Sequence, residues 1–170
     1  MEYYDALSRS YDELYGQEQA PKHRMIQELL KGRRFVLAVD VGCGTGKFLL
    51  QAGCSFQTGI GIDLSWEMLK KAQSRKSPKV HLIMADASSL PIKNGAADLI
   101  VSVSLTEAES TLPEVLAELG RIAGRSTTLA LTVFQQQGSK QLQLLRVERW
   151  TKISDRENLY LVQLNPGENK

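Results

Sequence analysis

Asp40 and the three glycines that follow it, Gly42, Gly44 and Gly46, are the residues whose types and spacing most clearly suggest chemistry. Glycine has no Cβ, so the main chain can turn sharply there and a ligand can lie against its N–H groups. Residues 35–40, just before the loop, are almost all apolar, as in a strand that is buried on both faces. The residues after the loop can begin a helix, whose unpaired N–H groups would face the same ligand. The pattern predicts a strand–loop–helix nucleotide site.

Two other kinds of nucleotide-binding loop do not fit this spacing. A dinucleotide loop of the form G-x-G-x-x-G requires a glycine at position 47, where this chain has Lys47. A phosphate-binding loop of the form G-x-x-x-x-G-K-[ST] requires a hydroxyl at position 48, where this chain has Phe48. The pattern that remains is D-x-G-x-G-x-G.

A carboxylate follows each of the next two predicted strands. Asp63 comes after the predicted strand at 56–62, about 20 residues beyond Gly42, the offset at which a ribose-binding acid follows a glycine loop. Its carboxylate could accept hydrogen bonds from both ribose hydroxyls, whereas the alternative role is that of a turn residue leading into a helix. Asp86 comes shortly after a predicted strand at Val80–Met84.

The remaining elements are expected to alternate in the same way. Ser65 can cap a helix, and Leu112–Ile122 has the apolar spacing of another. The N-terminal region predicts a helix over 1–16 that ends at Gly16, a linker over 17–21 and a second helix over 22–31. The other predicted elements are strands at 97–103 and 126–134, a helix at 138–146, and an antiparallel hairpin formed by 147–153 and 159–164.

Composition sets the class of the protein. A chain of 170 residues with 42% hydrophobic and 24% charged residues fits one ordinary globular domain. No apolar run is long enough to span a membrane, and two cysteines and two histidines form neither a disulfide framework nor a metal-ligand cluster, so a cytoplasmic location is expected. The net charge of +2 is too small to indicate a nucleic-acid partner by itself, although basic residues cluster at 22–34 and 70–79.

Three stretches, D-V-G-C-G-T-G, G-I-D-L-S-W-E-M-L and A-D-A-S-S-L-P, together resemble the class I S-adenosylmethionine-dependent methyltransferases, most strongly over residues 35–134. The resemblance implies a doubly wound α/β fold with a mostly parallel sheet and one antiparallel strand near the C-terminus. It also implies a single domain over 1–170, with a helical cap at 1–31, a cofactor-binding core at 35–134 and a C-terminal helix and hairpin at 138–165. The residues expected to bind S-adenosyl-L-methionine are Asp40, Gly42, Cys43, Gly44, Gly46, Asp63, Leu64, Asp86, Ala87 and Ser102.

The resemblance leaves the methyl acceptor open. Tyr11 is a candidate lid residue and Glu107 a candidate general base, although packing and helix-leading roles are the alternatives. One hypothesis is an acceptor that is a macromolecule, RNA or protein, with a small activator subunit. The others are a small-molecule acceptor and a cofactor-binding module without catalysis.

The third predicted strand, Val80–Met84, is expected at an edge of the sheet, where it carries neither proline nor lysine. Small methyltransferases of this class can be activated by a compact zinc-binding protein that adds a strand there, and this chain resembles them in its bare edge. The alternative is an edge that is too short to recruit a partner or that the N-terminal segment covers.

Overall fold

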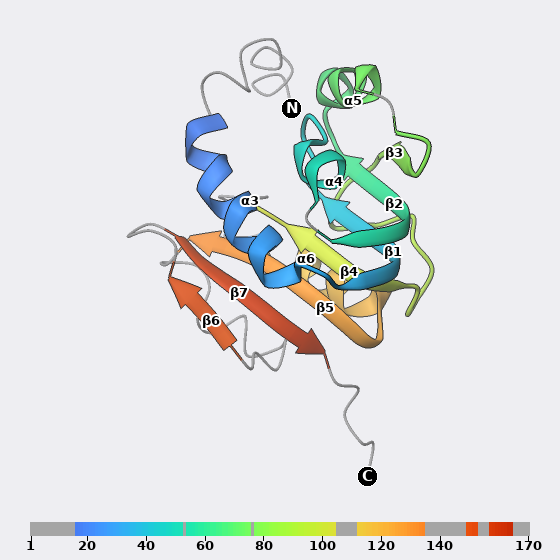
Figure 1. The fold of residues 1–170 in the computed structure, drawn as a ribbon. Helices are drawn as coiled ribbons and strands as arrows, with labels where there is room; N and C mark the ends of the chain where they lie inside the picture. Colours follow the sequence, from blue (N-terminus) through green and yellow to red (C-terminus); the bar gives the residue numbers. More distant parts are fainter. Residues whose placement is uncertain are drawn as a thin grey trace.

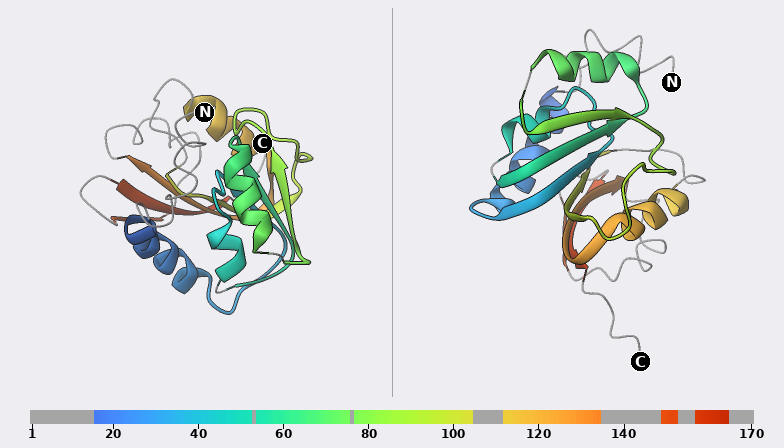
Figure 2. Two further views of the ribbon diagram at one scale, coloured as in Figure 1. Left: turned by 90° about the horizontal axis from the view of Figure 1, so that it is seen from above. Right: turned by 90° about the vertical axis from the view of Figure 1, so that its right-hand side faces the viewer.

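The computed structural model describes residues 16–52, 54–75, 77–104, 112–134, 149–152 and 157–164. These residues form a seven-stranded sheet in the order β3-β2-β1-β4-β5-β7-β6, with helices on both of its faces (Figures 1 and 2). The elements in chain order are α3 (Gly16–Leu30), β1 (Arg34–Val41), α4 (Lys47–Gln51), β2 (Ser55–Asp63), α5 (Trp66–Ser74), β3 (Val80–Met84), β4 (Ala97–Ser102), α6 (Leu112–Ile122), β5 (Ala123–Phe134), β6 (Arg149–Lys152) and β7 (Glu157–Leu164).

The sheet has the predicted direction of strands. β1 pairs in parallel with both β2 and β4, and the parallel pairing extends to β3 on one side and β5 on the other. β7 runs antiparallel to β5 and to β6, so it is the reversed strand near the C-terminus. The prediction of a doubly wound, mostly parallel α/β fold is confirmed, as is the position of β3 at an edge.

Alternate residues of the central strands supply two hydrophobic layers. On one face, Ile100 and Leu129 pack with the buried side of α6. On the other face, Leu99 and Ala130 pack with α3 and α4. Figure 2 shows the same division, with α3 and α4 on one side of the sheet and α6 on the other. Burial on both faces explains why these strands are nearly continuous apolar runs.

Asp98 links β4 to β1 on the amino-terminal side of their regular pairing. Its two carboxylate oxygens accept hydrogen bonds from the main-chain N–H groups of Val36 (2.7 Å) and Leu37 (2.8 Å). The regular pairing of the two strands starts one residue later, at Ala38 and Leu99. Asp98 therefore has a structural role, at the end of the sheet remote from the glycine loop.

The predicted linker at 17–21 is wrong, and so is the expectation that Gly16 ends a helix. Both lie in α3, which begins at Gly16 and contains Pro21. Proline has no main-chain donor, so α3 lacks the bond that residue 21 would otherwise donate to the carbonyl of Gln17. Lys22, Ile26 and Leu30 are buried at helical spacing, and this packing holds α3 together.

Other boundaries differ by a few residues. β5 begins at Ala123 instead of at position 126, because strand pairing starts directly where α6 ends. The predicted C-terminal hairpin is present as β6 and β7. Tyr11, Glu107 and the predicted helix at 138–146 lie outside the described residues. The division into a cap, a core and a C-terminal unit remains a prediction.

Candidate functional site

The glycine loop lies at the carboxyl end of β1. Gly42, Gly44 and Gly46 have φ angles of 76°, 51° and 73°, in the left-handed region that side-chain-bearing residues rarely adopt. The N–H groups of Gly42 and Cys43 donate to the carbonyl oxygen of Ile62 at 2.8 and 2.9 Å. The loop is therefore fixed against the end of β2.

Asp63, the last residue of β2, holds the loop through its side chain. One carboxylate oxygen accepts from the N–H of Gly44 at 2.7 Å, and the other accepts from the N–H of Ser65 at 2.9 Å. A carboxylate offers about four acceptor positions, so these two bonds leave capacity for the ribose hydroxyls. The structure thus adds a loop-positioning role to the predicted ribose-binding role.

Arg75 holds the loop from the other side, and the sequence analysis did not find it. It follows α5, and its guanidinium donates to the carbonyl oxygen of Thr45 and to the Thr45 hydroxyl, the latter at 3.0 Å. Thr45 is buried beneath the contact. These residues are far apart in the chain, and no local sequence pattern indicates that they meet.

The glycines differ in what they face. A Cβ on Gly46 would lie 3.0 Å from the Cβ of Ala72, and a Cβ on Gly61 would lie 2.9 Å from the sulfur of Cys43. A Cβ on Gly44 would meet no atom of the described structure within 4 Å. Gly46 and Gly61 are therefore required for packing, whereas the described residues leave open the space before Gly44, where a ligand could lie.

A cavity of about 40 Å³ adjoins the loop, between β1 and α3. It is lined by Gly16, Gln19, His23, Asp40, Gly42, Cys43, Gly44, Thr45, Lys47 and Val103. Four predicted site residues, Asp40, Gly42, Cys43 and Gly44, are brought together here.

Burial controls the protonation of two groups in the loop. Burial and, secondarily, the charge of Asp63 raise the pKa of Asp40 to about 8, so Asp40 carries a proton at neutral pH. Burial, followed by the carboxyl groups of Asp40 and Asp63, raises the pKa of the Cys43 thiol well above its ordinary value. The thiolate is the nucleophilic form of cysteine, so Cys43 is not activated as a nucleophile.

Ser102 ends β4 beside the same region. Its side chain is fully buried, and among the described residues its Oγ has no hydrogen-bond partner. A buried hydroxyl without a partner is costly, and such groups in native structures call for an explanation. Ser102 stays a predicted ligand-binding residue.

α3 places a cation over the carboxyl end of β4. The ammonium group of Lys22 is buried and lies 2.8 Å from the Ser104 hydroxyl and 3.3 Å from a carboxylate oxygen of Glu18. Ser104 has a φ of 53°, which is unusual for a residue with a side chain, and its N–H donates to the Thr132 hydroxyl at 2.7 Å. No local sequence pattern predicts this contact, because Lys22 and Ser104 are far apart in the chain.

His23 lies next to this cation. Burial, followed by the charges of Lys47 and Lys22, lowers the pKa of His23 to about 4, so its imidazole is neutral at physiological pH. The ring packs edge-on against Phe48, with 5.8 Å between centroids. A neutral imidazole therefore lines the cavity beside the loop.

The predicted adenine-binding residues lie at the neighbouring strand ends. Asp63 is in register with Met84, so Leu64 and Asp86 both lie just beyond the carboxyl ends of β2 and β3. Asp86 is exposed, and one of its oxygens accepts from the N–H and hydroxyl of Ser88, both at 2.8 Å. These bonds lower the pKa of Asp86, which keeps it an acceptor.

Exposed apolar side chains also lie at the carboxyl ends of β2 and β3. Leu64 is 47% exposed, Met84 57% and Trp66 58%. Large apolar side chains that remain exposed together in this way are a feature of ligand-binding surfaces. They suit a planar, mostly apolar group beside Asp86 and Ala87.

Comparison with known proteins points to one family. The family model described as a methyltransferase domain matches residues 38–124. The chain is 35% identical over 123 residues to the uncharacterized protein MJ1252 of Methanocaldococcus jannaschii, covering 71% of this chain and 46% of that protein. It is 29% identical over 121 residues to a malonyl-[acyl-carrier protein] O-methyltransferase of Hamiltonella defensa, covering 71% and 45%. The chain thus spans about half the length of these curated relatives.

Two solved structures share the fold. A candidate S-adenosyl-L-methionine-dependent methyltransferase from Methanococcus maripaludis superposes with a TM-score of 0.76 at 16% identity, covering 98% of this chain and 95% of that one. A complex between the Haloferax volcanii Trm112 methyltransferase activator and a candidate methyltransferase has a TM-score of 0.67 at 22% identity, covering 76% and 59%.

Proposed function

Because the chain belongs to the class I S-adenosylmethionine-dependent methyltransferases, we propose that it transfers a methyl group from S-adenosylmethionine to an acceptor at the carboxyl end of β4. The observation that carries the proposal is the open space in front of Gly44, next to the carboxylate of Asp63. In that space a ligand can lie against the main chain while its hydroxyls bond to a fixed acceptor.

The residues present fit this cofactor. Asp63 would accept from the ribose hydroxyls, and Gly44 would let the ligand approach the main chain. Asp86 and Ala87 would bind the edge of the adenine, and Leu64 would pack on its face. A Cβ on Gly44 would meet no atom of the described residues beyond its chain neighbours within 4 Å.

Catalysis would consist mainly of positioning. S-adenosylmethionine supplies an activated methyl group, so the protein has to align the acceptor and exclude water. The raised pKa of Cys43 argues against a covalent intermediate on that residue. With a pKa of about 4, His23 is neutral at physiological pH. Its imidazole could therefore accept a hydrogen bond from an N–H or O–H group of the methyl acceptor without removing the proton.

We infer that a partner could add a strand at the β3 edge. The N–H of Gly59 donates to the carbonyl of Lys79 at 2.7 Å, and the N–H of Ala85 donates to the carbonyl of Asp63 at 3.1 Å. Main-chain groups alternate in direction along a strand, so those of every second residue face away from β2. These outward-facing residues are Val80, Leu82 and Met84. The Haloferax volcanii complex supports an activator of the Trm112 type as the partner.

Replacing Leu82 by proline tests this edge. The substitution removes the outward N–H but leaves the bonds to β2, and proline is tolerated on edge strands. We expect Leu82→Pro to abolish co-purification with a co-expressed Trm112-type activator taken from the organism that encodes this chain. Because the Leu82 side chain packs over Gly61, Leu82→Val serves as the control for altered packing and should retain the complex. A complex that forms equally with Leu82→Pro would exclude strand addition at this edge.

A small acceptor with a carboxylate is the second candidate. Lys22, which is held between Ser104 and Glu18 at the end of β4, would supply a positive charge close to such a carboxylate. The similarity to malonyl-[acyl-carrier protein] O-methyltransferases supports the carboxylate, since their name describes transfer to an oxygen of a malonyl group, although that group is carried by a protein.

Transfer of a labelled methyl group tests the proposed function. Chain purified alone and with the activator would be incubated with tritiated S-adenosylmethionine and fractions of cell RNA, protein and small acids. We expect label in one fraction, and loss of that label with Gly44→Val. Tight cofactor binding without label in any fraction, with or without the activator, would instead indicate a binding module without catalysis.

A further inference from the structure

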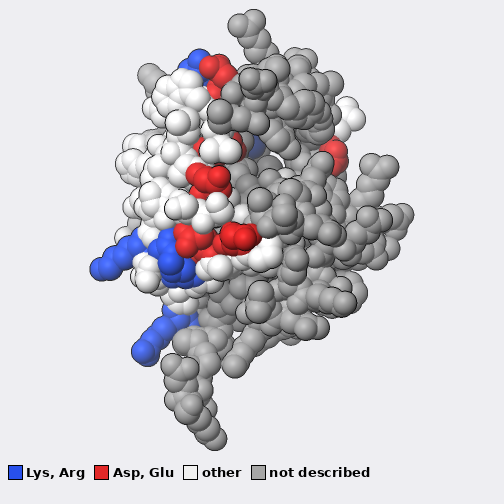
Figure 3. Space-filling view, turned by 180° about the vertical axis from the view of Figure 1, so that it is seen from behind, with Lys and Arg blue, Asp and Glu red and all other residues white. Residues whose placement is uncertain are grey.

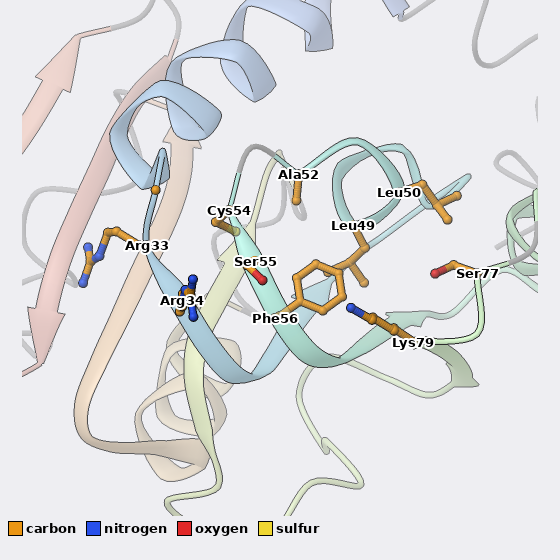
Figure 4. Close-up of a pocket in the computed structure, with 11 residues that line it drawn as sticks. Arg33, Arg34, Leu49, Leu50, Ala52, Cys54, Ser55, Phe56, Ser77 and Lys79 are labelled. Carbon is orange, nitrogen blue, oxygen red and sulfur yellow. The ribbon is translucent and has the colours of Figure 1, made fainter.

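A groove lies at the end of the sheet opposite the glycine loop. Its volume is about 520 Å³, within the range of ligand-binding sites. It is lined by Gly32, Arg33, Arg34, Leu49, Leu50, Ala52, Cys54, Ser55, Phe56, Ser77 and Lys79 (Figure 4). Three of these residues are basic, and none is acidic.

The fold brings two separate basic clusters of the sequence together at this groove. Arg34 begins β1 and pairs with Ser55 of β2, whose N–H donates to the carbonyl of Arg33 at 3.0 Å. Lys79 immediately precedes β3, and its carbonyl is fixed by the N–H of Gly59. Arg34 and Lys79, the last residues of the clusters at 22–34 and 70–79, are far apart in the chain. The pairing of β1, β2 and β3 therefore sets the positions of their main chains.

The basic side chains have different surroundings. Arg34 and Lys79 are exposed, so their charged groups can move to meet a ligand. Arg33 is held at the rim, where it donates to the Thr128 hydroxyl at 2.8 Å and lies 5.4 Å from the centre of the Phe35 ring. Figure 4 shows Arg33 directed away from the groove and Lys79 reaching toward the ring of Phe56.

Charge elsewhere on the described surface is more mixed. On the face shown in Figure 3, acidic side chains lie beside basic ones. Arg121 and Glu118 form one such pair of opposite charges, with 2.6 Å between Arg121 Nε and Glu118 Oε1. The groove is lined by basic residues and by no carboxylate, which favours an anion.

We propose that this groove binds the phosphate of a nucleotide between Arg34 and Lys79. The hydroxyls of Ser55 and Ser77 supply further donors, while Phe56 and the aliphatic residues of α4 supply an apolar wall for the base. The groove and the cavity beside the glycine loop share no lining residue, and Arg34 and Lys79 lie at the amino ends of β1 and β3, whereas the loop follows the carboxyl end of β1, so the two sites are distinct. The nucleotide belongs either to a single-stranded RNA or to a free mononucleotide.

Binding measurements on the full chain test the proposal and distinguish the two sources. The probes are a fluorescein-labelled oligouridylate, followed by anisotropy, and UMP, followed by calorimetry. Both are measured at two salt concentrations. Arg34→Gln with Lys79→Gln removes the proposed phosphate contacts. Lys70→Gln with Lys93→Gln is the matched control, because it removes the same charge from other exposed positions.

We expect the Arg34/Lys79 variant to bind its probe at least about tenfold more weakly than the parent, with the control unchanged. For the strand, the slope of log affinity against log salt should fall by about 0.7, the value for one phosphate that is no longer neutralised. The probe that the parent binds more tightly identifies the source. Failure of the parent to bind either probe, or equal weakening by the two double variants, would overturn the proposal.

Discussion

Gly44→Val is expected to abolish measurable binding of S-adenosylmethionine. The residue has a φ of 51°, and a Cβ there would project into space that no atom of the described structure occupies within 4 Å. The added side chain would therefore fill the volume assigned to the ligand. We expect a loss of affinity of at least about 100-fold, equivalent to roughly 3 kcal/mol, in calorimetric titrations.

Backbone strain is the competing explanation, and Gly32 provides the control for it. Gly32 also has a positive φ, of 75°, and a Cβ there also meets nothing within 4 Å. It lies between α3 and β1, away from the glycine loop. Gly32→Val should lower the melting temperature about as much as Gly44→Val but leave the affinity for S-adenosylmethionine unchanged. Equal loss of binding in both variants would mean that strain, not occupied volume, caused the effect.

Asp63→Ala is expected to weaken S-adenosylmethionine binding by about 1.5–3 kcal/mol, the usual contribution of hydrogen bonds to a charged group. The substitution removes the proposed acceptor for the ribose and also releases the N–H groups of Gly44 and Ser65. The free energy of unfolding should therefore fall as well. Calorimetry would report the first effect and thermal unfolding the second.

Asp98→Ala separates these two effects. Asp98 also accepts from two main-chain N–H groups, those of Val36 and Leu37, but at the other end of the sheet. We expect Asp98→Ala to destabilise the fold without changing the affinity for S-adenosylmethionine. If Asp63→Ala binds the cofactor like the parent, the ribose assignment is wrong.

The glycine loop and the order of its flanking elements were predictable because their information is local. Left-handed φ angles at Gly42, Gly44 and Gly46 follow from residue type, and buried parallel strands show as apolar runs. The position of Asp63 at the carboxyl end of β2 follows from spacing in the same way.

Contacts between distant residues were not predictable from such patterns. Nothing near Arg75 indicates that it reaches Thr45, and nothing near Lys22 indicates that it reaches Ser104. The course of α3 was misread for a related reason. Pro21 has the local signature of a helix start, whereas burial of Ile26 and its neighbours against the sheet sustains one continuous helix. Tertiary packing, which the sequence does not display, decided each of these.

The most direct test of the account is a calorimetric comparison of S-adenosylmethionine, its demethylated product S-adenosylhomocysteine, and NAD on the purified chain. Lys47 replaces the third glycine of a dinucleotide loop, and its side chain lines the cavity beside Gly44. The account predicts that both adenosyl ligands bind and that NAD gives no measurable heat. Comparable affinity for NAD, or no binding of S-adenosylmethionine, would contradict it.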